Sequence, residues 1–543
     1  MSKHIIKLSI CFYLLLIFKL LVANEEHSLK DTNTSFDKSA MSTLPYLAID
    51  KLVEKTMATF QVPGVAIGIV KDGKIIHLQG YGIANLDSAS KVDEDTIFKI
   101  ASNSKAFTTA ALAILVDQGK LNWDDKVIKY LPDFQIYDSW VSNEFNIIDL
   151  LTHRSGLRIG AGDLMLWPEP TKFTRSEVVH NLRYLKSVTS FRDQYAYDNL
   201  LYIVAGEVVA AISGQPWEEF IKTAIFEPLN MQNCFGGGID TKKYSNLVAP
   251  HFVINDKLSV DNANLINDKT SLMAAAGGVK CSVSDLMKWV NVLLQGGLME
   301  NGEPLFSLAQ RDTLWQPVTR LPLSEKTKQL DEAHYRGYAL GWRIGDYHGH
   351  WRISHTGTLS GSMSQIIMLP DQQLGVVILT NQQSGAARNA LARGILQEFT
   401  GENKIDWVDY YLAAAAERVA KKRSYVDMTG EVDFPEENLI ADSKQNRKLL
   451  GKFVDPWFGE ITLSRKNAKI VFQSKKSPRM TGEVFFYNDN QWWVKWDDRS
   501  FDADAWLYFD SAQRSSKVKL SMKQISAAAD FSFDFQDLNF IKK

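Results

Sequence analysis

The sequence predicts an α+β fold, with an antiparallel sheet flanked by helices and a second, smaller all-β domain of barrel-like form. Strand-like apolar runs occur near the start of the chain, at 64–78, and again at 338–379, with helix-like periodicity between them. From Leu449 the pattern changes to short alternating strands. The length of 543 residues also exceeds what one hydrophobic core usually serves, which favours two domains.

Local sequence patterns predict each helix and strand of the larger domain. Asp72-Gly73 between two apolar runs predicts a hairpin, and apolar residues at three- and four-residue steps predict helices. We expect the first hairpin to pair with the last strands. The expected strands are 64–70, 74–78, 338–344, 351–355, 363–369 and 374–379, and the expected helices are 100–119, 200–212, 284–294 with a cap at Ser284-Asp285, 386–399, and 406–423 as a connecting helix.

The expected organisation is a signal peptide at 1–23, a flexible leader at 24–45, a catalytic domain at 46–400, a linker with a helix at 401–444 and a β-rich domain at 445–543. The β-rich domain has alternating strands such as Trp492/Val494/Trp496. Its tryptophans could line a ligand site that attaches the enzyme to carbohydrate or cell wall, but an aromatic core is the preferred interpretation. These tryptophans are Trp457, Trp492, Trp493, Trp496 and Trp506.

The N-terminus has the features of an export signal. Lys3 and Lys7 precede an apolar run, which ends near Leu21-Val22-Ala23 before polar residues. Lys19 interrupts the run and argues against a membrane-spanning helix there, although an uncleaved N-terminal anchor stays open. No other stretch is expected to span a bilayer, so the predicted location is secreted or periplasmic. The net charge of −2 does not favour a nucleic-acid partner.

Export would leave the mature chain with Cys234 and Cys281. An oxidising compartment makes a disulfide possible, but a large core does not need one. Two unpaired buried thiols are the preferred expectation.

Ser102 and Lys105 are the first candidates for chemistry, at the start of the predicted helix 100–119. Residues at i and i+3 share a helix face, so the amine can lie beside the hydroxyl. The unpaired N–H groups of a helix N-terminus favour a developing negative charge. A Ser-x-x-Lys match alone is weak, and it needs support from the rest of the chain.

Two later segments supply that support. Tyr197 and Asn199 precede a predicted helix, and His355-Thr356-Gly357-Thr358 ends a predicted strand. A serine hydroxyl needs a nearby base, and Lys105 or Tyr197 could serve if its pKa is lowered. Asn199 could orient the lysine and hold a substrate amide, Gly357 could let substrate approach the strand, and the N–H groups of Ser102 and Thr358 could form an oxyanion hole.

At these residues the chain resembles the serine β-lactamase, penicillin-binding protein and esterase superfamily, in its class C-like, D-aminopeptidase-like (peptidase S12-like) branch. The resemblance covers about residues 46–398 and follows five landmarks in the family's order. The landmarks are Ser102-Asn103-Ser104-Lys105, Leu151-Thr152-His153-Arg154-Ser155-Gly156-Leu157, Tyr197-Asp198-Asn199, Ala276-Gly277-Gly278 and His355-Thr356-Gly357. It implies that Ser102 is acylated, that Lys105 and Tyr197 share the general-base work, and that the C-terminal part is a lipocalin-like β domain.

Two alternatives concern individual residues. Tyr244-Ser245-Asn246 matches the family's second motif more closely than Tyr197-Asp198-Asn199 does. It lacks the apolar helix that should follow the motif, so Tyr197 is preferred. His355 could be a structural histidine, yet its place before Thr-Gly at a strand end favours the active site. Many members of the resembled family carry lysine there, and a largely neutral histidine weakens the attraction for a carboxylate.

The expected function is therefore an exported serine hydrolase that works through an acyl-enzyme, with no metal and no cofactor. Expected substrates are D-amino-acid peptides or amides, small esters and, with weaker support, β-lactams; peptidoglycan fragments are possible partners. The alternative is a non-catalytic penicillin-binding-like protein that recognises cell-wall fragments.

Overall fold

The computed structural model of the chain describes residues 45–254, 257–401, 404–428, 449–467, 469–488, 490–501, 503–510, 518–525 and 529–543. The expected signal peptide, nearly all of the expected leader and the part of the expected linker beyond Met428 lie outside these residues.

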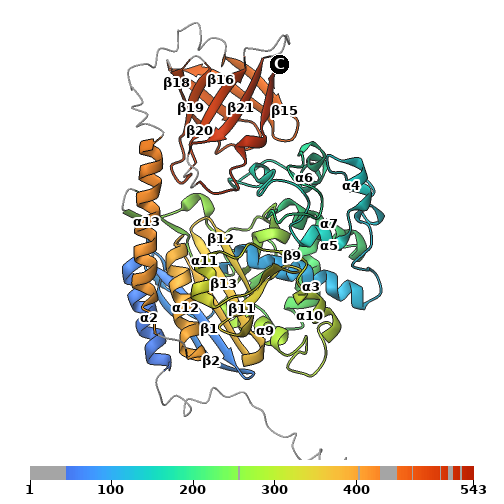
Figure 1. Cartoon of the computed structure of the whole chain (residues 1–543), viewed down its shortest axis with the longest axis vertical. Coiled ribbons are helices and arrows are strands. Elements are labelled where there is room, and N and C mark those ends of the chain that lie inside the picture. Colours follow the sequence, from blue (N-terminus) through green and yellow to red (C-terminus); the bar gives the residue numbers. More distant parts are fainter. Residues whose placement is uncertain are drawn as a thin grey trace, which may run out of the picture. The chain divides into compact units, whose positions relative to one another are not determined.

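The predicted antiparallel sheet is present and has nine strands (Figure 1). The predicted pairing of the first hairpin with the last strands is confirmed, because β1 runs antiparallel to β14 with Ile67 opposite Ile378. In spatial order the strands are β3 (Ser90–Lys91), β2 (Lys74–Asn85), β1 (Gly64–Lys71), β14 (Leu374–Thr380), β13 (Ser362–Leu369), β12 (His350–Leu359), β11 (Arg343–Tyr347), β10 (Arg336–Tyr338) and β9 (Thr319–Arg320).

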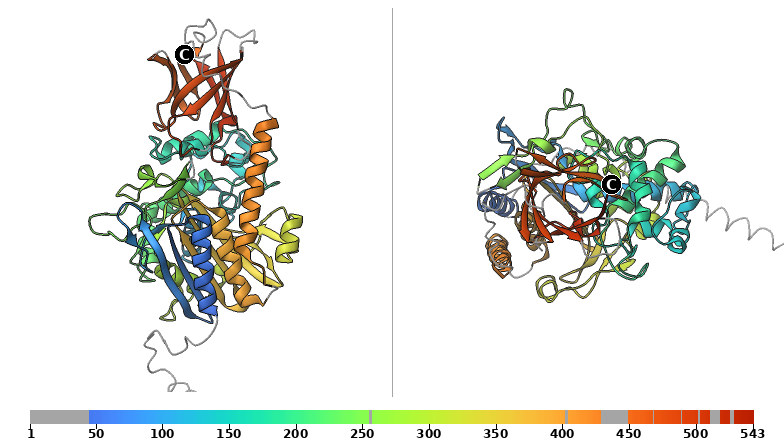
Figure 2. Two further views of the ribbon diagram at one scale, coloured as in Figure 1. Left: turned by 90° about the vertical axis from the view of Figure 1, so that its left-hand side faces the viewer. Right: turned by 90° about the horizontal axis from the view of Figure 1, so that it is seen from above.

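Helices cover both faces of this sheet. On one face, α2 (Pro45–Phe60) and α12 (Gly385–Thr400) bury Val53 and Ile395 against Ile67, and the left view of Figure 2 shows the two helices side by side. On the other face, α9 (Val283–Leu294) packs against β1 and β14. Alternate residues of the central strands therefore enter different cores, as expected for a sheet buried on both sides.

The remaining helices lie between the early and late strands, apart from α13 (Trp407–Met428) after α12. They are α3 (Ser104–Asp117), α4 (Ser139–Glu144), α5 (Ile147–Leu151), α6 (Arg175–Asn181), α7 (Leu200–Ser213), α8 (Trp217–Ile221), α10 (Leu308–Trp315) and α11 (Glu325–Asp331). Within the described residues, no single helix combines the length and apolar composition of a membrane span; α7 together with Trp217–Phe226 meets the criteria only as a pair bent by 75°.

The cap of α9 differs from the expectation. Ser282, rather than Ser284, is the N-cap, and its hydroxyl accepts from the Asp285 N–H. Ser282 has the extended backbone conformation that an N-cap needs, whereas Ser284 already lies in the first helical turn.

Two small sheets accompany the large one, and one of them holds a disulfide. Cys234 and Cys281 are bonded to each other, so the expectation of two unpaired thiols is wrong. They lie opposite each other on neighbouring strands, and this proximity could not be inferred from positions 47 residues apart in the sequence. The strands of this sheet, in spatial order, are β4 (Phe98–Lys99), β8 (Lys280–Cys281) and β5 (Cys234–Phe235), and β6 (His251–Ile254) pairs with β7 (Lys257–Val260).

The C-terminal β-rich part forms a closed eight-stranded barrel, as the alternating pattern predicts. Trp457, Trp492 and Trp496 are buried in it, which confirms the aromatic core for these three; Trp493 and Trp506 are partly exposed. The strands are β15 (Gly451–Asp455), β16 (Gly459–Lys466), β17 (Lys469–Ser474), β18 (Thr481–Asn488), β19 (Gln491–Trp496), β20 (Ala505–Asp510), β21 (Lys519–Gln524) and β22 (Asn539–Lys542).

Candidate active site

Ser102 lies in a short 3₁₀ turn immediately before α3. The helix expected from residue 100 thus begins at Ser104, and Ser102 stands in front of its N-terminus. Ala101 has a φ of +49°, a left-handed conformation that costs a non-glycine residue about 1–3 kcal/mol. Ser104 holds the turn, because its hydroxyl donates to the Ala101 carbonyl at 2.6 Å and accepts from the Val279 N–H at 3.0 Å.

Lys105 is fully buried in the first turn of α3. Its Nζ donates to Asn199 Oδ1 at 2.7 Å and to the Ala276 carbonyl at 2.8 Å, and it lies 4.8 Å from the centre of the Tyr197 ring. Burial lowers the pKa of Lys105 to about 7, against the opposing effect of the Asp163 carboxyl. A large share of the amine is therefore unprotonated near neutral pH, as a general base requires.

Tyr197 reaches the same place from the loop before α7, and its hydroxyl hydrogen-bonds to Ser102. Burial raises the pKa of Tyr197 to about 12, although the Arg343 guanidinium acts in the other direction. The phenol is protonated near neutral pH. The sequence left open which of the two groups is the base, and these pKa directions favour Lys105.

Asn199 connects Lys105 to a carboxyl group that the sequence did not single out. While Asn199 Oδ1 accepts from Lys105, its Nδ2 donates to Asp163 Oδ2 at 2.9 Å. The same oxygen accepts from the Ser532 hydroxyl at 2.9 Å, and the Gly162 N–H donates to Asp534. Residues of the C-terminal domain therefore contact the hydrogen-bond network of Lys105.

A cavity of about 140 Å³ opens at Ser102. Its walls combine the Ser102 turn with Asp163, Asn199 and Thr358, and the C-terminal domain contributes Ser500, Asp530, Ser532 and Phe533. Phe531, next to Ser532, packs its ring 5.9 Å from that of Tyr197. Residues of both domains thus form the walls of this cavity.

The predicted motif His355–Thr358 lies on β12, beside the Ser102 turn. Thr358 is exposed and lines the cavity. His355 is buried: its Nε2 lies 3.0 Å from the Tyr338 hydroxyl and its Nδ1 lies 2.8 Å from the Thr356 carbonyl. Burial, with Arg343 and Lys105 nearby, holds the pKa of His355 well below its usual value, so the ring is neutral.

Gly357 is required by the protein's own backbone. A Cβ at this position would lie 2.3 Å from the Ile100 carbonyl oxygen and 2.3 Å from Ser364 Oγ. We expected this glycine to admit substrate, but the group that approaches it is the segment just before Ser102. The absence of a side chain allows the turn that carries Ser102 to pack on β12.

Arg343 is a further residue that sequence reasoning missed. From β11 it places its guanidinium 5.8 Å from the centre of the Tyr197 ring and donates to Thr356 Oγ1 at 3.3 Å. A fixed positive charge is therefore present beside the motif, although position 355 is a neutral histidine. No sequence pattern pointed to Arg343, because β11 and β12 meet only through sheet register.

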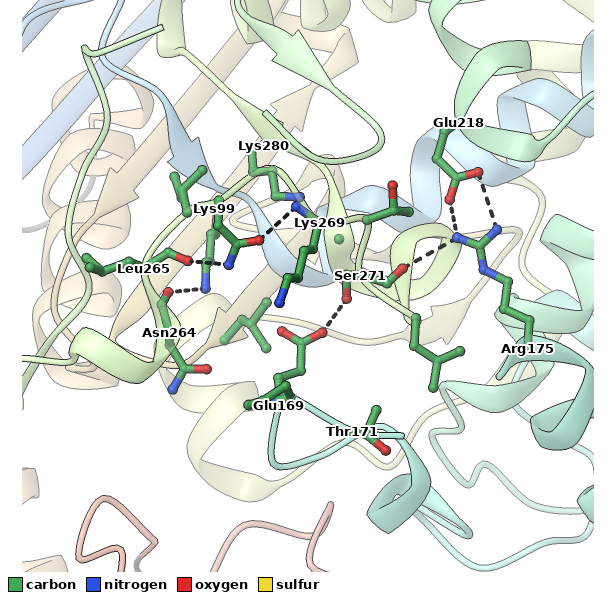
Figure 3. Close-up of a pocket in the computed structure, with 18 of the residues that line it drawn as sticks. Lys99, Glu169, Thr171, Arg175, Glu218, Asn264, Leu265, Lys269, Ser271 and Lys280 are labelled. Carbon is green, nitrogen blue, oxygen red and sulfur yellow. Dashed lines mark hydrogen bonds and ion pairs between the residues drawn. The ribbon is translucent and has the colours of Figure 1, made fainter. Parts of the chain in front are cut away.

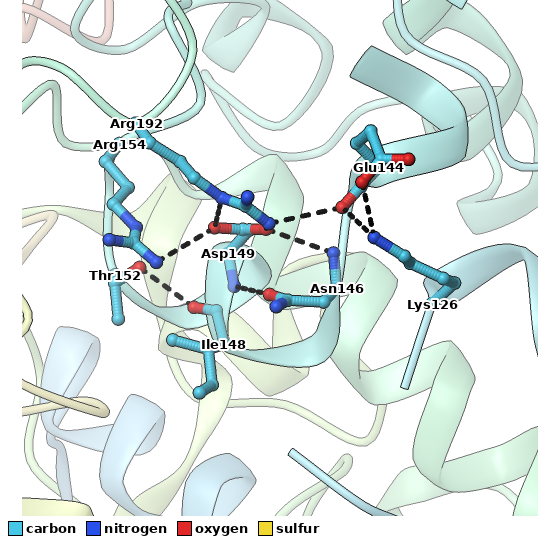
Figure 4. Close-up of polar contacts among 8 residues, drawn as sticks. All are labelled: Lys126, Glu144, Asn146, Ile148, Asp149, Thr152, Arg154 and Arg192. Carbon is cyan, nitrogen blue, oxygen red and sulfur yellow. Dashed lines mark hydrogen bonds and ion pairs between the residues drawn. The ribbon is translucent and has the colours of Figure 1, made fainter. Parts of the chain in front are cut away.

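A buried carboxylate holds the loop that carries Tyr197 (Figure 4). Asp149 is inaccessible to solvent and forms ion pairs with Arg154 at 3.2 Å and with Arg192 at 2.6 Å. Next to Arg154, the ring of His153 packs 4.2 Å from the ring of Tyr197. The motif at 151–157 thus acts on the position of Tyr197 through packing and ion pairs.

The rival residue Tyr244 lies elsewhere. Its ring packs 4.8 Å from that of Phe235, and it lines a different cavity from the one at Ser102. Among the described residues, no group of three or more His, Cys, Asp or Glu side chains is arranged to hold a metal ion.

Comparison with known families gives two matches. A family model described as Beta-lactamase matches residues 49–398, and a model described as a domain of unknown function (DUF3471) matches residues 436–542. An unguisins hydrolase of Aspergillus campestris is 26% identical over 375 residues, which are 66% of this chain and 67% of that protein. The protein flp of Staphylococcus aureus strain N315 is 26% identical over 349 residues, which are 62% and 63% of the two chains.

Solved structures share the fold. An octameric penicillin-binding protein homologue from Pyrococcus abyssi aligns with a TM-score of 0.58 at 20% identity, over 92% of this chain and 100% of that one. A class C β-lactamase from Rhodobacter sphaeroides aligns with a TM-score of 0.52 at 19% identity, over 65% and 99%.

Proposed function

This chain belongs to the β-lactamase family, and from that premise we propose that it is an exported serine hydrolase that cleaves amide or ester bonds through a Ser102 acyl-enzyme. The observation that carries the proposal is the buried amine of Lys105, which lies over the Tyr197 ring while the Tyr197 hydroxyl bonds Ser102. Ligand binding alone would not require a buried amine beside a serine and a tyrosine, whereas removal of the serine proton does.

In the proposed reaction, the Tyr197 hydroxyl passes the Ser102 proton to the neutral amine of Lys105 as Ser102 Oγ attacks the substrate carbonyl carbon. The carbonyl electron pair moves to oxygen, where the Ser102 and Thr358 N–H groups stabilise it. The intermediate then expels an amine or alcohol, which takes the proton back from Lys105. Water attacks the ester of Ser102 by the same route and releases the acid.

Arg343 bears on the substrate class. We expected the replacement of lysine by His355 to weaken the attraction for a carboxylate, but the Arg343 guanidinium beside Thr356 supplies a charge at this edge of the site. We therefore keep D-amino-acid peptides and amides, small esters and β-lactams in the proposed range, with preference for substrates that bear a carboxylate near the scissile bond.

The test combines a serine-directed fluorophosphonate probe with a panel of esters, D-alanyl amides and nitrocefin. We expect mass spectrometry to place the adduct on Ser102. Ser102→Ala should abolish labelling and lower kcat/KM at least about a thousandfold, since the nucleophile is lost. Tyr197→Phe should lower it by about a hundredfold, the usual size of a proton-transfer contribution.

The chain offers a matched control in Tyr244→Phe, which removes the same hydroxyl from the rival motif and should leave turnover unchanged. Labelling that survives Ser102→Ala would overturn the assignment. Ligand-induced melting shifts without turnover of any substrate would favour the alternative, a binding protein for cell-wall fragments.

The proposed export has a separate test. If residues 1–23 are a cleaved signal, the intact mass of the secreted or periplasmic protein should correspond to a chain beginning at Asn24. Retention of the full mass in a membrane fraction would indicate the N-terminal anchor instead.

A further inference from the structure

A second, larger cavity of about 800 Å³ adjoins the one at Ser102 (Figure 3). The two cavities share Gly277 and Leu359 in their walls. Gly277 belongs to the segment that accepts a hydrogen bond from Lys105 through the neighbouring Ala276 carbonyl. We take Gly277 as the point at which a substrate bound at Ser102 would enter this cavity.

Two buried lysines form part of its wall. Lys99 on β4 and Lys280 on β8 are directly opposite each other in the strand register, and each is only 6% exposed. Lys99 Nζ donates to the Asn264 carbonyl at 2.5 Å, and Lys280 Nζ donates to the Gly237 carbonyl at 2.7 Å. Among the described residues neither lysine has an ion-pair partner, which is an uncommon state for two adjacent buried ammonium groups.

The acidic groups of the cavity do not balance these charges. Glu218 is bound to Arg175, so this pair contributes no net charge. Glu169 accepts a hydrogen bond from Ser271, and Figure 3 shows Lys269 directed toward the same part of the cavity. Glu219 also lines the cavity and forms an ion pair with Lys222 at 3.5 Å. After these two pairs are set aside, three lysines face one free carboxylate, that of Glu169.

The strand that carries Lys280 is covalently fixed. Cys281, the next residue, is bonded to Cys234 on β5, so the backbone under Lys280 is tied on that side. Burial and the neighbouring Lys99 lower the pKa of Lys280 to about 8, against the opposing effects of the Glu169 and Glu218 carboxylates. An anion in the cavity would relieve this repulsion.

We propose that this cavity is a subsite for a carboxylate on the remote end of the substrate, bound by Lys99 and Lys280 with Lys269 at the entrance. The proposal rests on the hydrolase function given above and specifies its substrate class: amides or esters that carry an anionic group distal to the bond that Ser102 attacks. This charge is separate from any carboxylate held near Arg343, because the two lysines belong to the cavity on the Gly277 side.

The test uses p-nitrophenyl esters of dicarboxylic acids of increasing chain length, each compared with an ester of equal length that ends in a methyl group. At the length that reaches the lysines, kcat/KM for the carboxylate ester should exceed that for the neutral ester by about tenfold, equivalent to about 1.4 kcal/mol. This advantage, the ratio of kcat/KM for the carboxylate ester to kcat/KM for the neutral ester of equal length, should fall with added KCl.

In the Lys99→Met/Lys280→Met variant, the advantage should disappear while turnover of the neutral ester is kept. Methionine retains the apolar stem and removes the buried charge, so folding should survive. Should that variant fail to fold, Lys269→Met tests the same charge at an exposed position and should reduce the advantage. Lys120→Met, which replaces an exposed lysine outside this cavity, is the matched control and should have no effect.

Calorimetric titration of suberate into the Ser102→Ala protein separates the subsite from the catalytic proposal. Suberate should bind, and the two lysine substitutions should weaken it. If Ser102 is not labelled but suberate binds in this way, the hydrolase proposal fails and the subsite stands. An advantage that is absent at every chain length, or that persists without the lysines, would overturn the subsite.

Discussion

At the scale of single residues, the site depends on how completely Lys105 is removed from water. Burial accounts for the lowered pKa of Lys105 and for the raised pKa of Tyr197 in the same cluster. The two shifts have one cause but opposite chemical effects. The amine becomes available as a base, while the phenol keeps its proton.

The pKa of Lys105 predicts the pH dependence of catalysis. Because the neutral amine is the active form, kcat/KM for an uncharged ester should rise about tenfold per pH unit below pH 7 and level off above it. The measurement is kcat/KM from pH 5 to 9, with thermal melts over the same range as the control for unfolding. A flat profile across pH 7 would contradict the assignment of Lys105 as base.

Asp163 predicts a pH dependence of stability. Burial raises the pKa of Asp163 from 3.8 to about 8, so the folded state holds this proton more tightly than the unfolded chain does. Its contribution is complete below about pH 4 and is lost as pH rises through about 8. The melting temperature of Asp163→Asn relative to the native protein should therefore increase from pH 5 to pH 9. A difference that does not vary with pH would contradict this.

The sequence alone singled out Ser102, Lys105, Tyr197 and Asn199, which the structure brings together, because short motifs at helix starts carry local information. It missed Asp163 and Arg343, since their roles depend on contacts between segments with no shared periodicity. The alternation of side chains along a strand could have predicted which residues of the motif 355–358 are buried and which are more exposed. On β12, His355 and Gly357 share the buried face, whereas Thr356 and Thr358 share the more exposed one.

At the scale of elements, ion pairs position the loop that carries Tyr197. Asp149 caps the N-terminus of α5 through a capping box with Asn146, and its carboxylate also forms ion pairs with Arg154 and Arg192. The Asp149 carboxylate thus connects three segments: the start of α5, the turn after α5 that contains Arg154, and the loop from Arg192 to Tyr197. The family resemblance singled out residues 151–157 as a landmark, but no pattern in the sequence linked this segment to residue 192.

Removing this carboxylate should therefore affect both stability and catalysis. Asp149→Ala leaves two arginines without their partner and should cost about 3 kcal/mol in the free energy of unfolding. Denaturant titration measures the cost, and kcat/KM at a temperature where the variant is folded measures the displacement of Tyr197. Asp312→Ala, which removes an exposed partner of Arg311, is the control and should cost less than about 1 kcal/mol. Equal costs for the two variants would contradict the structural role.

At the scale of the whole molecule, the C-terminal domain takes part in the site. The composition change at Leu449 predicted a separate β domain, and its closed barrel bears this out. Its contact with the Ser102 cavity could not be predicted, because Phe531, Ser532 and Phe533 have the alternation of an ordinary strand. In the structure this segment precedes β22 without joining a strand, and it places Ser532 on Asp163.

The Ser532 contact predicts communication between the domains. Ser532→Ala removes one of the hydrogen bonds to Asp163, whose carboxyl acts on Lys105. We expect a fewfold lower kcat/KM and a shift in the midpoint of its acid limb, with little change in melting temperature. Ser521→Ala, an exposed serine on β21 of the same barrel, should change neither. An unchanged midpoint in Ser532→Ala would show that the barrel does not influence the base.

The pairing of β1 with β14 determines when the large sheet can be completed during synthesis. Val65 meets Thr380, so the central seam forms only after nearly the whole catalytic domain has emerged from the ribosome. Until then the hairpin of β1 and β2 presents an open edge to other nascent chains, a hazard for aggregation. Release before β14 should thus yield insoluble protein, and slow long-range pairing should govern the folding rate.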